Sequence, residues 1–189
     1  YYRNEATPFV FRAVNRLDRD TSGLVLLAKN PYSSCVLSDA VKDHTIHREY
    51  AAIVSGKTDA SGTIDLPIAR KDGSTIERVC DPERGETAVT HYRTFAYNKD
   101  ADISFIRLLL ETGRTHQIRV HMKAIGHPLP GDFLYCPDYR FIDRQPLHST
   151  YLRFSHPVTG EKLEFSASLP EDMRKLFPDI KNPSGPVFF

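Results

Sequence analysis

The chain has 189 residues, 40% of them apolar, and this length and composition predict one domain with a substantial buried core. Lysine and arginine number 25 against 24 acidic residues, so the formal charge of +1 excludes a uniformly basic protein that coats nucleic acid. Any nucleic-acid contact would need a local basic patch. The sequence contains no apolar run of about 18 residues and begins without a secretory signal pattern, so no membrane span is predicted.

The chain contains three cysteines, Cys35, Cys80 and Cys136, which are far apart and form no C-x-x-C pair. An odd number of separated cysteines predicts neither a disulfide framework nor a zinc site. Each is interpreted as a small buried hydrophobic residue. This usage is typical of a reducing compartment, and we predict a cytoplasmic location.

The stretch NRLDRDTSGLVLLA, residues 15–28, joins a charged half to an apolar half. Four charged side chains, among them Asp18, lie within residues 16–20, and an uninterrupted apolar run follows from Leu24 to Ala28. A short apolar run after a Thr-Ser-Gly turn predicts a strand over 24–29 that is buried on both faces. Asp18 is therefore expected on a loop held at the edge of the core.

The other patterns along the chain predict strands more often than helices. Helices are predicted from Pro31 to His44 and over Leu169–Leu176. Strands are predicted, in chain order, over 9–14, 48–56, 62–69, 86–97, 102–111, 149–155 and 162–165, with a loop or exposed hairpin over 70–85, a Pro-rich loop over 127–146 and a loose tail over 177–189. Because several strands follow one another directly, the fold class is predicted to be α+β with a largely antiparallel sheet.

Residues 112–132, TGRTHQIRVHMKAIGHPLPGD, predict a helix that presents two different faces. Thr115 is expected to cap its start, and Gly126 is expected directly after its end. An apolar stripe that faces the core comprises Ile118, Met122 and Ile125. A basic stripe on another face comprises His116, Arg119 and Lys123.

Asp18 and Arg119 are candidates for an ion pair across the fold. An arginine beside a carboxylate stabilises its ionised form. An ionised, desolvated carboxylate is suited to attack as a nucleophile or to stabilise a developing sugar cation. Taken singly, each residue has an ordinary alternative, which is a surface aspartate for Asp18 and a solvated helical arginine for Arg119.

Three motifs, in one order and spacing, resemble those of the RluA-type RNA pseudouridine synthases. They are R-L-D-x-x-T-S-G at 16–23, R-E-Y-A ending in V-x-G at 48–56, and T-G-R-T-H-Q-I-R-V-H-M followed by G-H-P-L-P-G-D at 112–132. Weaker matches occur at 65–67 and 147–149. In that family His usually precedes the first motif, and Asn15 stands there in this chain, so the hydrogen bonds of this loop are expected to differ.

The resemblance implies the pseudouridine synthase fold, a mixed, mostly antiparallel, bent β-sheet flanked by a few helices, in one catalytic domain over residues 1–189. It also implies that the start of this domain and any N-terminal RNA-binding domain lie outside this chain. The implied activity isomerises specific uridines in structured RNA, ribosomal RNA first and transfer RNA second, after base flipping. No cofactor is implied, and a monomer is expected.

The resemblance also implies roles for individual residues. Asp18 would attack carbon 1 of the sugar or promote loss of its carbon 2 proton, Arg119 would pair with Asp18, and Tyr50 would contact the base and help to remove the carbon 5 proton. Arg16 would fill the gap left by the flipped base. Further candidate RNA contacts are Arg12, Arg114, His116 and Lys123. No metal site is predicted, because His116 and His121 are five residues apart rather than four.

Two other classes of function stay open. A catalytically silent RNA-binding module of the same fold would be expected to lack Asp18, Tyr50 or Arg119, and all three are present. A glycoside hydrolase would need two carboxylates that face one bond. Asp18 and Asp20 are a conceivable pair, but their neighbours are arginines and the chain has no Trp to stack on a sugar.

Overall fold

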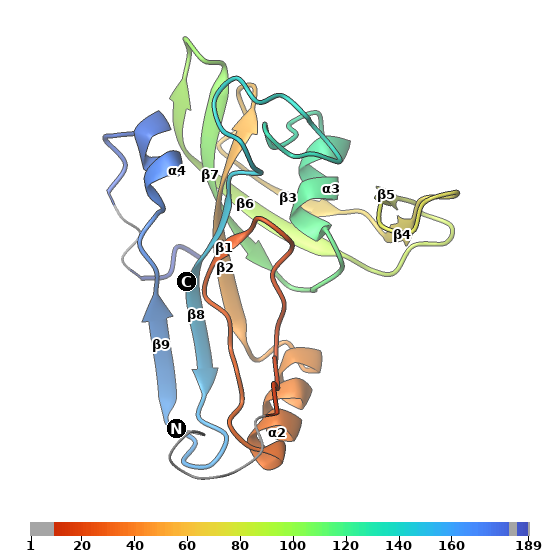
Figure 1. Ribbon diagram of the computed structural model, residues 1–189, viewed down its shortest axis with the longest axis vertical. Helices are drawn as coiled ribbons and strands as arrows, with labels where there is room; N and C mark the ends of the chain where they lie inside the picture. Colours follow the sequence, from red (N-terminus) through yellow and green to blue (C-terminus); the bar gives the residue numbers. More distant parts are fainter. Residues whose placement is uncertain (1–9, 182–184, 189) are drawn as a thin grey trace.

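The computed structural model describes residues 10–181 and 185–188, in which a seven-stranded sheet carries helices on both faces (Figure 1). The elements are β1 Ser22–Gly23, α2 Pro31–Lys42, β2 His47–Ser55, β3 Ser61–Asp65, β4 Ile68–Arg70, β5 Arg78–Cys80, β6 Val89–Asn98, β7 Ile103–Leu110, α3 Gln117–Ala124, β8 Leu147–Ser155, β9 Lys162–Ser166 and α4 Glu171–Leu176. The sheet order is β1-β8-β2-β7-β6-β3, and β9 also pairs with β8. Only β1 and β8 run parallel among these strands, so the predicted α+β class with a mixed, mostly antiparallel sheet is confirmed.

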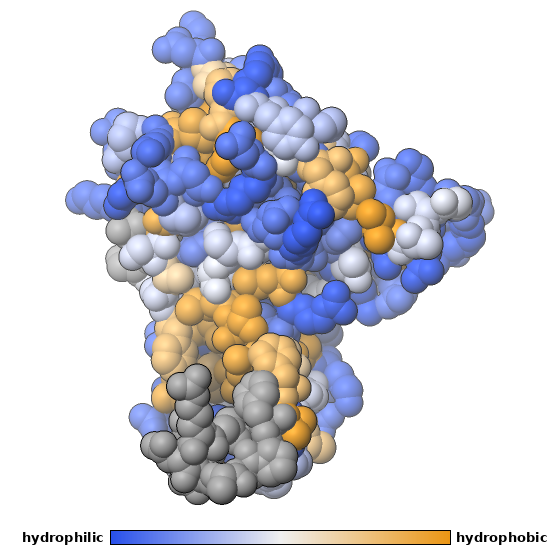
Figure 2. Space-filling view, in the orientation of Figure 1, coloured by the Kyte–Doolittle hydropathy of each residue, from blue (hydrophilic) through white to orange (hydrophobic). Residues whose placement is uncertain are grey.

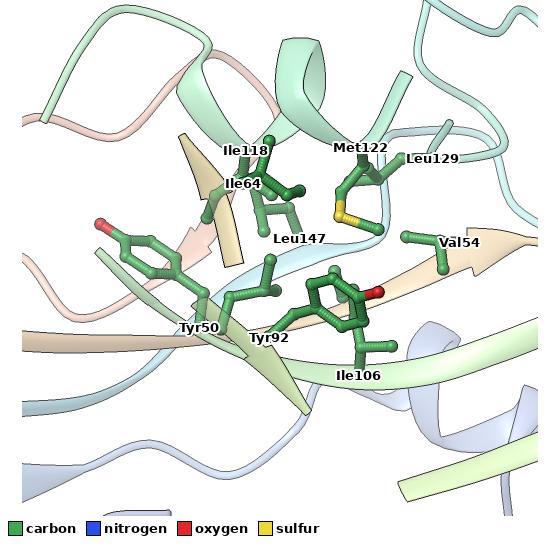
Figure 3. Close-up of a cluster of buried hydrophobic side chains, with 11 residues drawn as sticks. Tyr50, Val54, Ile64, Tyr92, Ile106, Ile118, Met122, Leu129 and Leu147 are labelled. Atoms are coloured by element: carbon green, nitrogen blue, oxygen red, sulfur yellow. The ribbon is translucent and has the colours of Figure 1, made fainter. Parts of the chain in front are cut away.

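The core is organised around β2, which lies between β7 and β8. Its residues from Ala51 to Val54 are fully buried, because both faces of the strand are covered. On one face Tyr50 and Val54 belong to a cluster that includes Ile118 and Met122 of α3 (Figure 3). The opposite face packs against a second cluster that contains α4. Helix α3 therefore packs on the face of the sheet from which the side chain of Tyr50 projects.

The predicted strand over 24–29 is wrong as a strand buried on both faces. Only Ser22–Gly23 pairs as β1, and Ala13 and Leu27 form a single isolated bridge. Exposure alternates along the run, with Val25 at 43% and Leu27 at 48%. The segment packs one face against a small cluster and lacks a neighbouring layer on its other face. That bridge is also the only pairing found in the described part of the predicted 9–14 strand, whose residue 9 lies outside the described residues.

Most other predicted elements are present, with shifts at their ends. The predicted 62–69 strand is interrupted at Leu66 and Pro67, so that β3 joins the main sheet while β4 pairs with β5 in a separate hairpin. This hairpin, residues 68–80, overlaps the charged segment 70–85, for which a loop or exposed hairpin is predicted. The interpretation of the cysteines as buried is wrong, because Cys35 is exposed and the other two are half-buried.

Helix α3 begins differently from its prediction. Its first residue is Gln117, and His116 precedes it in a left-handed conformation with φ 59°, so Thr115 is not the N-cap. The side chain of Gln117 takes over the polar contacts at this end, since its Oε1 accepts from the Arg114 N–H at 2.9 Å. The predicted apolar stripe is confirmed, and Gly126 follows the helix in a left-handed conformation.

A buried ion pair lies on the opposite face of β2 from Tyr50. Arg107 Nη2 donates to Glu49 Oε2 at 2.5 Å, and both side chains are almost completely buried. The Val187 N–H donates to the same carboxylate at 2.9 Å, and the Gly185 carbonyl accepts from Arg107 at 3.3 Å. The prediction of a loose tail is therefore wrong for residues 185–188, because buried charges of the sheet hold this segment. Within the described residues, no helix is long and apolar enough to cross a membrane.

His121 anchors α3 to the sheet from inside the core. It is fully buried, its Nδ1 lies 2.9 Å from Thr90 Oγ1, and its Nε2 lies 2.9 Å from the Leu66 carbonyl oxygen. A carbonyl can only accept, so Nε2 carries the proton and Nδ1 accepts from Thr90. Burial is the main reason that the pKa of His121 lies below its ordinary value.

Replacement of Gly23 by Ala is expected to destabilise the fold by roughly 1–3 kcal/mol. Gly23 has φ 110°, and a Cβ atom there would lie 2.2 Å from the Ser149 carbonyl oxygen of β8. Gly160→Ala is the matched control, because Gly160 is also left-handed (φ 72°) but has nothing within 4 Å of such a Cβ. Chemical denaturation would measure both variants, and equal losses would contradict a steric role for Gly23.

The free energy of unfolding is expected to fall as the pH is lowered below about 6.5, the ordinary pKa of histidine. Because the pKa of His121 is lowered in the folded state, the unfolded chain binds protons first as the pH falls, which favours unfolding. Urea unfolding at pH 7 and pH 5 would measure the loss. His121→Gln should reduce the pH dependence, with His44→Asn, at an exposed position, as the control. An unchanged dependence in His121→Gln would contradict this assignment.

Candidate active site

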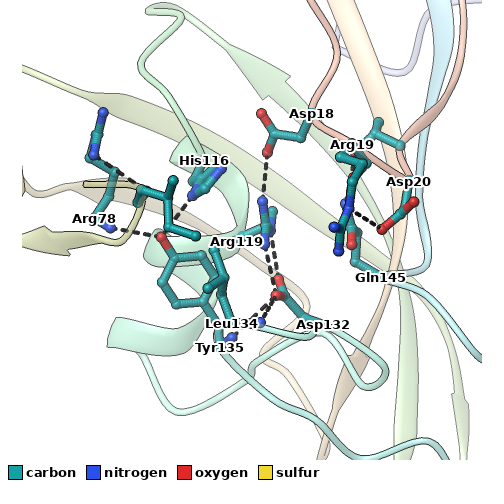
Figure 4. A network of polar contacts seen from close by, with 12 residues as sticks. Asp18, Arg19, Asp20, Arg78, His116, Arg119, Asp132, Leu134, Tyr135 and Gln145 are labelled. Atoms are coloured by element: carbon teal, nitrogen blue, oxygen red, sulfur yellow. Dashed lines mark hydrogen bonds and ion pairs between the residues drawn. The ribbon is translucent and has the colours of Figure 1, made fainter. Parts of the chain in front are cut away.

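The site forms where the loop before β1 meets α3. Asp18 Oδ2 lies 3.1 Å from Arg119 Nη1, although the two residues are 101 positions apart (Figure 4). The Asp18 side chain is 24% exposed and the Arg119 side chain 1% exposed, so the pair joins a buried cation to a carboxylate at a surface opening. The ion pair predicted from the sequence is present, while the catalytic roles of its members stay predictions.

Backbone and side-chain hydrogen bonds hold the Asp18 loop at both ends. Asn15 Oδ1 accepts from the Leu26 N–H at 2.8 Å, and the Val14 N–H donates to the Leu26 carbonyl at 2.9 Å. The Thr21 N–H donates to the Asp18 carbonyl at 3.0 Å, which closes the turn. Asn15 therefore ties this loop to the segment after β1 through its Oδ1, while its buried Nδ2 has no hydrogen-bond partner among the described residues.

A second carboxylate, Asp132, determines how Arg119 is oriented. Arg119 Nε donates to Asp132 Oδ2 at 2.6 Å and Nη2 donates to Oδ1 at 2.8 Å, so the contact is bidentate. Asp132 is fully buried and also accepts from the N–H groups of Leu134 and Tyr135. This leaves Nη1 of Arg119 for Asp18. Asp132 ends the motif at 112–132, but the sequence pattern indicated no role for this residue.

The guanidinium of Arg119 is held in its charged form. Burial opposes the charge, but hydrogen bonds and charges from Asp132 and Asp18 together raise the pKa of Arg119 above its ordinary value. The Tyr135 ring lies 4.9 Å from Arg119 Cζ and covers it. Two carboxylates share one guanidinium, so the group carries a net negative charge, and Asp18 is its more exposed member.

A cleft of about 390 Å³ lies in front of Asp18. Its lining includes the loop 13–18, Arg48 and Tyr50 from β2, the segment 113–118, and Leu147. Asp18 is the only carboxylate among these lining residues, all of which belong to the described part of the chain. Tyr50 is 6% exposed, and burial is the main reason that its pKa is raised. Its phenol is therefore neutral near pH 7.

His116 joins the cleft to the β4–β5 hairpin through Tyr135, a residue that no sequence motif indicated. The Arg78 N–H donates to the Tyr135 hydroxyl at 2.9 Å, and His116 Nδ1 lies 2.9 Å from the same oxygen. If the hydroxyl donates to Nδ1, all three groups are satisfied and Nε2 of His116 carries the proton. Burial lowers the pKa of His116 and raises that of Tyr135 to about 12, so both are neutral near pH 7.

The predicted RNA-contacting residues separate into two groups. Arg16, Arg114 and His116 line the cleft. Arg114 is also tied to the chain beside β6, since it forms an ion pair with Glu86 and donates to the Thr87 carbonyl. Arg12 and Lys123 lie outside the lining. The basic residues that line the cleft among these candidates thus come from the loop before β1 and the loop before α3.

A second hollow of about 360 Å³ adjoins the cleft and shares residues 113–115 with it. Four arginines line this hollow, namely Arg70, Arg78, Arg84 and Arg114. Hydrophilic residues predominate on the projecting β4–β5 hairpin beside it (Figure 2). Ile76 and Val79 of the hairpin are also exposed. The charge pattern of residues 70–85 predicted a loop or exposed hairpin here, but did not indicate that it adjoins the site. Among the described residues, no group of three or more His, Cys, Asp or Glu could hold a metal ion.

Asp132→Asn is expected to destabilise the protein by about 3–5 kcal/mol, since it removes a charged partner from a fully buried guanidinium. Thermal or urea unfolding would measure the loss. Asp138→Asn is the matched control, because Asp138 lies in the same loop and pairs with the exposed Arg140. The control should leave the unfolding midpoint almost unchanged, and an equally small effect of Asp132→Asn would contradict the proposed anchoring of Arg119.

The chain is similar to known proteins over most of its length. Residues 1–124 match the family model described as RNA pseudouridylate synthase. The chain is 47% identical over 177 residues to the uncharacterized RNA pseudouridine synthase YjbO of Bacillus subtilis (strain 168), with coverage of 93% of this chain and 62% of that protein. It is 44% identical over 174 residues to the ribosomal large subunit pseudouridine synthase D of Vibrio cholerae, with coverage of 85% and 53%.

A solved structure agrees with these matches. The human RNA pseudouridylate synthase domain containing 1 superimposes with a TM-score of 0.73 at 25% identity, with coverage of 93% of this chain and 83% of that chain. This chain spans 62% and 53% of the length of the two bacterial relatives. The chain belongs to the RNA pseudouridylate synthase family, as its motifs predict from their resemblance to the RluA-type enzymes.

Proposed function

We propose that residues 1–189 are part of an RNA pseudouridine synthase and form its catalytic domain, which isomerises specific uridines in structured RNA. The observation that carries this proposal is the placement of Asp18, a partly exposed carboxylate bound to the buried Arg119 at the edge of a cleft. The cleft lies within the roughly 300–1,000 Å³ typical of small-molecule sites. A single nucleotide flipped out of an RNA helix is a ligand of this class.

The reaction breaks the bond between carbon 1 of the sugar and nitrogen 1 of uracil. It then forms a bond from carbon 1 to carbon 5 of uracil, carbon 5 loses its proton, and nitrogen 1 gains one. Asp18 begins either route, since its carboxylate can attack carbon 1 or accept the carbon 2 proton of the sugar. Arg119 holds Asp18 in place through Nη1. Asp132 binds the other two nitrogens of the same guanidinium and so fixes its orientation.

Tyr50 is proposed to contact the uracil ring. It lies on the cleft wall, and its raised pKa keeps the phenol neutral, which favours stacking on the base over removal of the carbon 5 proton by a phenolate. His116 is proposed to donate from Nε2 to the RNA. These roles place the neutral hydrogen-bonding groups around the base and the charged carboxylate at the sugar.

The RNA outside the cleft is proposed to lie along the second hollow, where the arginines of the β4–β5 hairpin can contact phosphates. Large-subunit ribosomal RNA is the favoured substrate, because one relative that aligns over most of this chain is named for that RNA. Transfer RNA is the second candidate. A monomer in the cytoplasm stays the expected state.

The contents of the cleft favour this function over a glycoside hydrolase. A hydrolase needs a second carboxylate that faces the same bond. Asp20 does not line the cleft, and its carboxylate is bound by Arg19 at 3.0 Å. No observation favours a silent RNA-binding module, since Asp18, Tyr50 and Arg119 are all placed at the cleft or its edge.

Asp18→Asn is expected to reduce pseudouridine formation by at least about a thousandfold, since a reacting carboxylate contributes several kcal/mol to catalysis. The assay would measure tritium release from in vitro transcripts of large-subunit ribosomal RNA that carry 5-tritiated uridine. Asp20→Asn is the matched control in the same loop, since asparagine tolerates the left-handed backbone of residue 20. Normal release by a folded Asp18→Asn variant, or no release by the wild type, would contradict the proposal.

A further inference from the structure

Arg48 lies beside the proposed base-contacting residue on β2. Alternate residues of a strand point to the same face, so Arg48 and Tyr50 project together towards the cleft, and both belong to its lining. Arg48 is only 8% exposed. The end of its guanidinium faces Gly113, where a Cβ atom would lie 3.2 Å from Arg48 Nη2. The glycine of the T-G-R-T motif thus leaves the space in which this guanidinium lies.

Within residues 10–181 and 185–188, Arg48 is a buried charge without a partner. Its Nε is buried and lacks a hydrogen bond, and none of the described carboxylates forms an ion pair with it. The other two deeply buried arginines differ, because Arg107 is paired with Glu49 and Arg119 with Asp132 and Asp18. An unpaired buried charge is costly in free energy. A protein retains such a group where a ligand supplies the opposite charge.

We propose that Arg48 binds a phosphate group of the nucleotide that enters the cleft. The planar fork of an arginine matches the oxygens of a phosphate, and the cleft's single carboxylate, Asp18, is bound to Arg119. The assignment of a uridine nucleotide rests on the proposed function. In such a nucleotide the phosphates are attached to the same ribose whose carbon 1 would face Asp18, so one cleft can hold both groups.

This contact gives the cleft a means to recognise a nucleotide within a chain. The phosphate would neutralise Arg48, while the base would lie against the neighbouring Tyr50. Burial raises the pKa of Tyr50 and the positive charge of Arg48 is the largest opposing influence, which agrees with a short separation between the two side chains. A free nucleoside lacks the phosphate and would leave the buried charge unpaired.

The test compares the binding of uridine, uridine 5′-monophosphate and uridine 3′-monophosphate to the full chain by calorimetry or NMR titration. The wild type is expected to bind at least one monophosphate about ten- to a hundredfold more tightly than uridine, as for a hydrogen bond to a charged group. Arg48→Met should abolish this preference and Arg48→Lys should retain part of it. The two monophosphates distinguish which phosphate of the nucleotide is bound.

Stability gives a second readout that a structural role would not produce. Arg48→Met should raise the melting temperature, because it removes an unpaired buried charge, whereas Arg107→Met should lower it by leaving Glu49 unpaired. Inorganic phosphate should stabilise the wild type more than Arg48→Met. Gly113→Ala should weaken monophosphate binding without a change of charge. Arg153→Met, outside the cleft lining, should bind like the wild type.

Three results would overturn the proposal. One is equal binding of uridine and both monophosphates by the wild type, and another is a phosphate preference that survives in Arg48→Met. The third is an equal loss of uridine and monophosphate binding in Arg48→Met, which would place the contact on the base. Failure of the proposed function is separate, since a wild type that prefers monophosphates but releases no tritium would retain the phosphate site and lose the assigned reaction.

Discussion

The guanidinium of Arg119 is the group on which the arrangement of the site depends. It lies in the interior of the protein, where a charge is tolerated only with close partners, and two carboxylates from different segments meet it. One comes from the loop before β1 and the other from the loop after α3. Because the apolar stripe of α3 fixes the helix on the sheet, the position of this cation also determines where both loops can lie.

The side chains of β2 alternate between two faces of the sheet. The residues proposed to bind RNA lie on one face, and the contacts that stabilise the fold lie on the other. Arg48 and Tyr50 face the cleft, while Glu49 between them faces away and binds Arg107 and the segment 185–188. Adjacent residues of β2 therefore have different roles, one in the cleft and the other in a buried ion pair. The buried carboxylate on the far face is paired with Arg107, whereas the buried Arg48 on the near face has no ion-pair partner in the part of the chain that the structure describes.

Sequence patterns identified the elements that are buried on both faces or that have a regular apolar stripe on one face. The central strand β2 and the stripe of α3 were predictable because burial on one or both faces leaves a clear apolar pattern. The run after Gly23 was misjudged, since composition does not reveal that one face lacks a neighbouring layer. Asp18 and Arg119 were found through their motifs, but the positions of Asp132 and Tyr135 depend on the path of a long loop. No local pattern indicates that Arg48 is buried with no partner among the described residues.

The Tyr135 hydroxyl joins three parts of the molecule that are distant in sequence. It accepts from the backbone of Arg78 at the start of β5, contacts His116 at the start of α3, and belongs to a ring that covers Arg119. A movement of the hairpin strand would therefore pull on one phenol oxygen and, through it, on an imidazole in the cleft wall. The cleft and the second hollow are thus linked by a short path of hydrogen bonds, and a ligand in the hollow that displaced β5 would also displace the imidazole in the cleft wall.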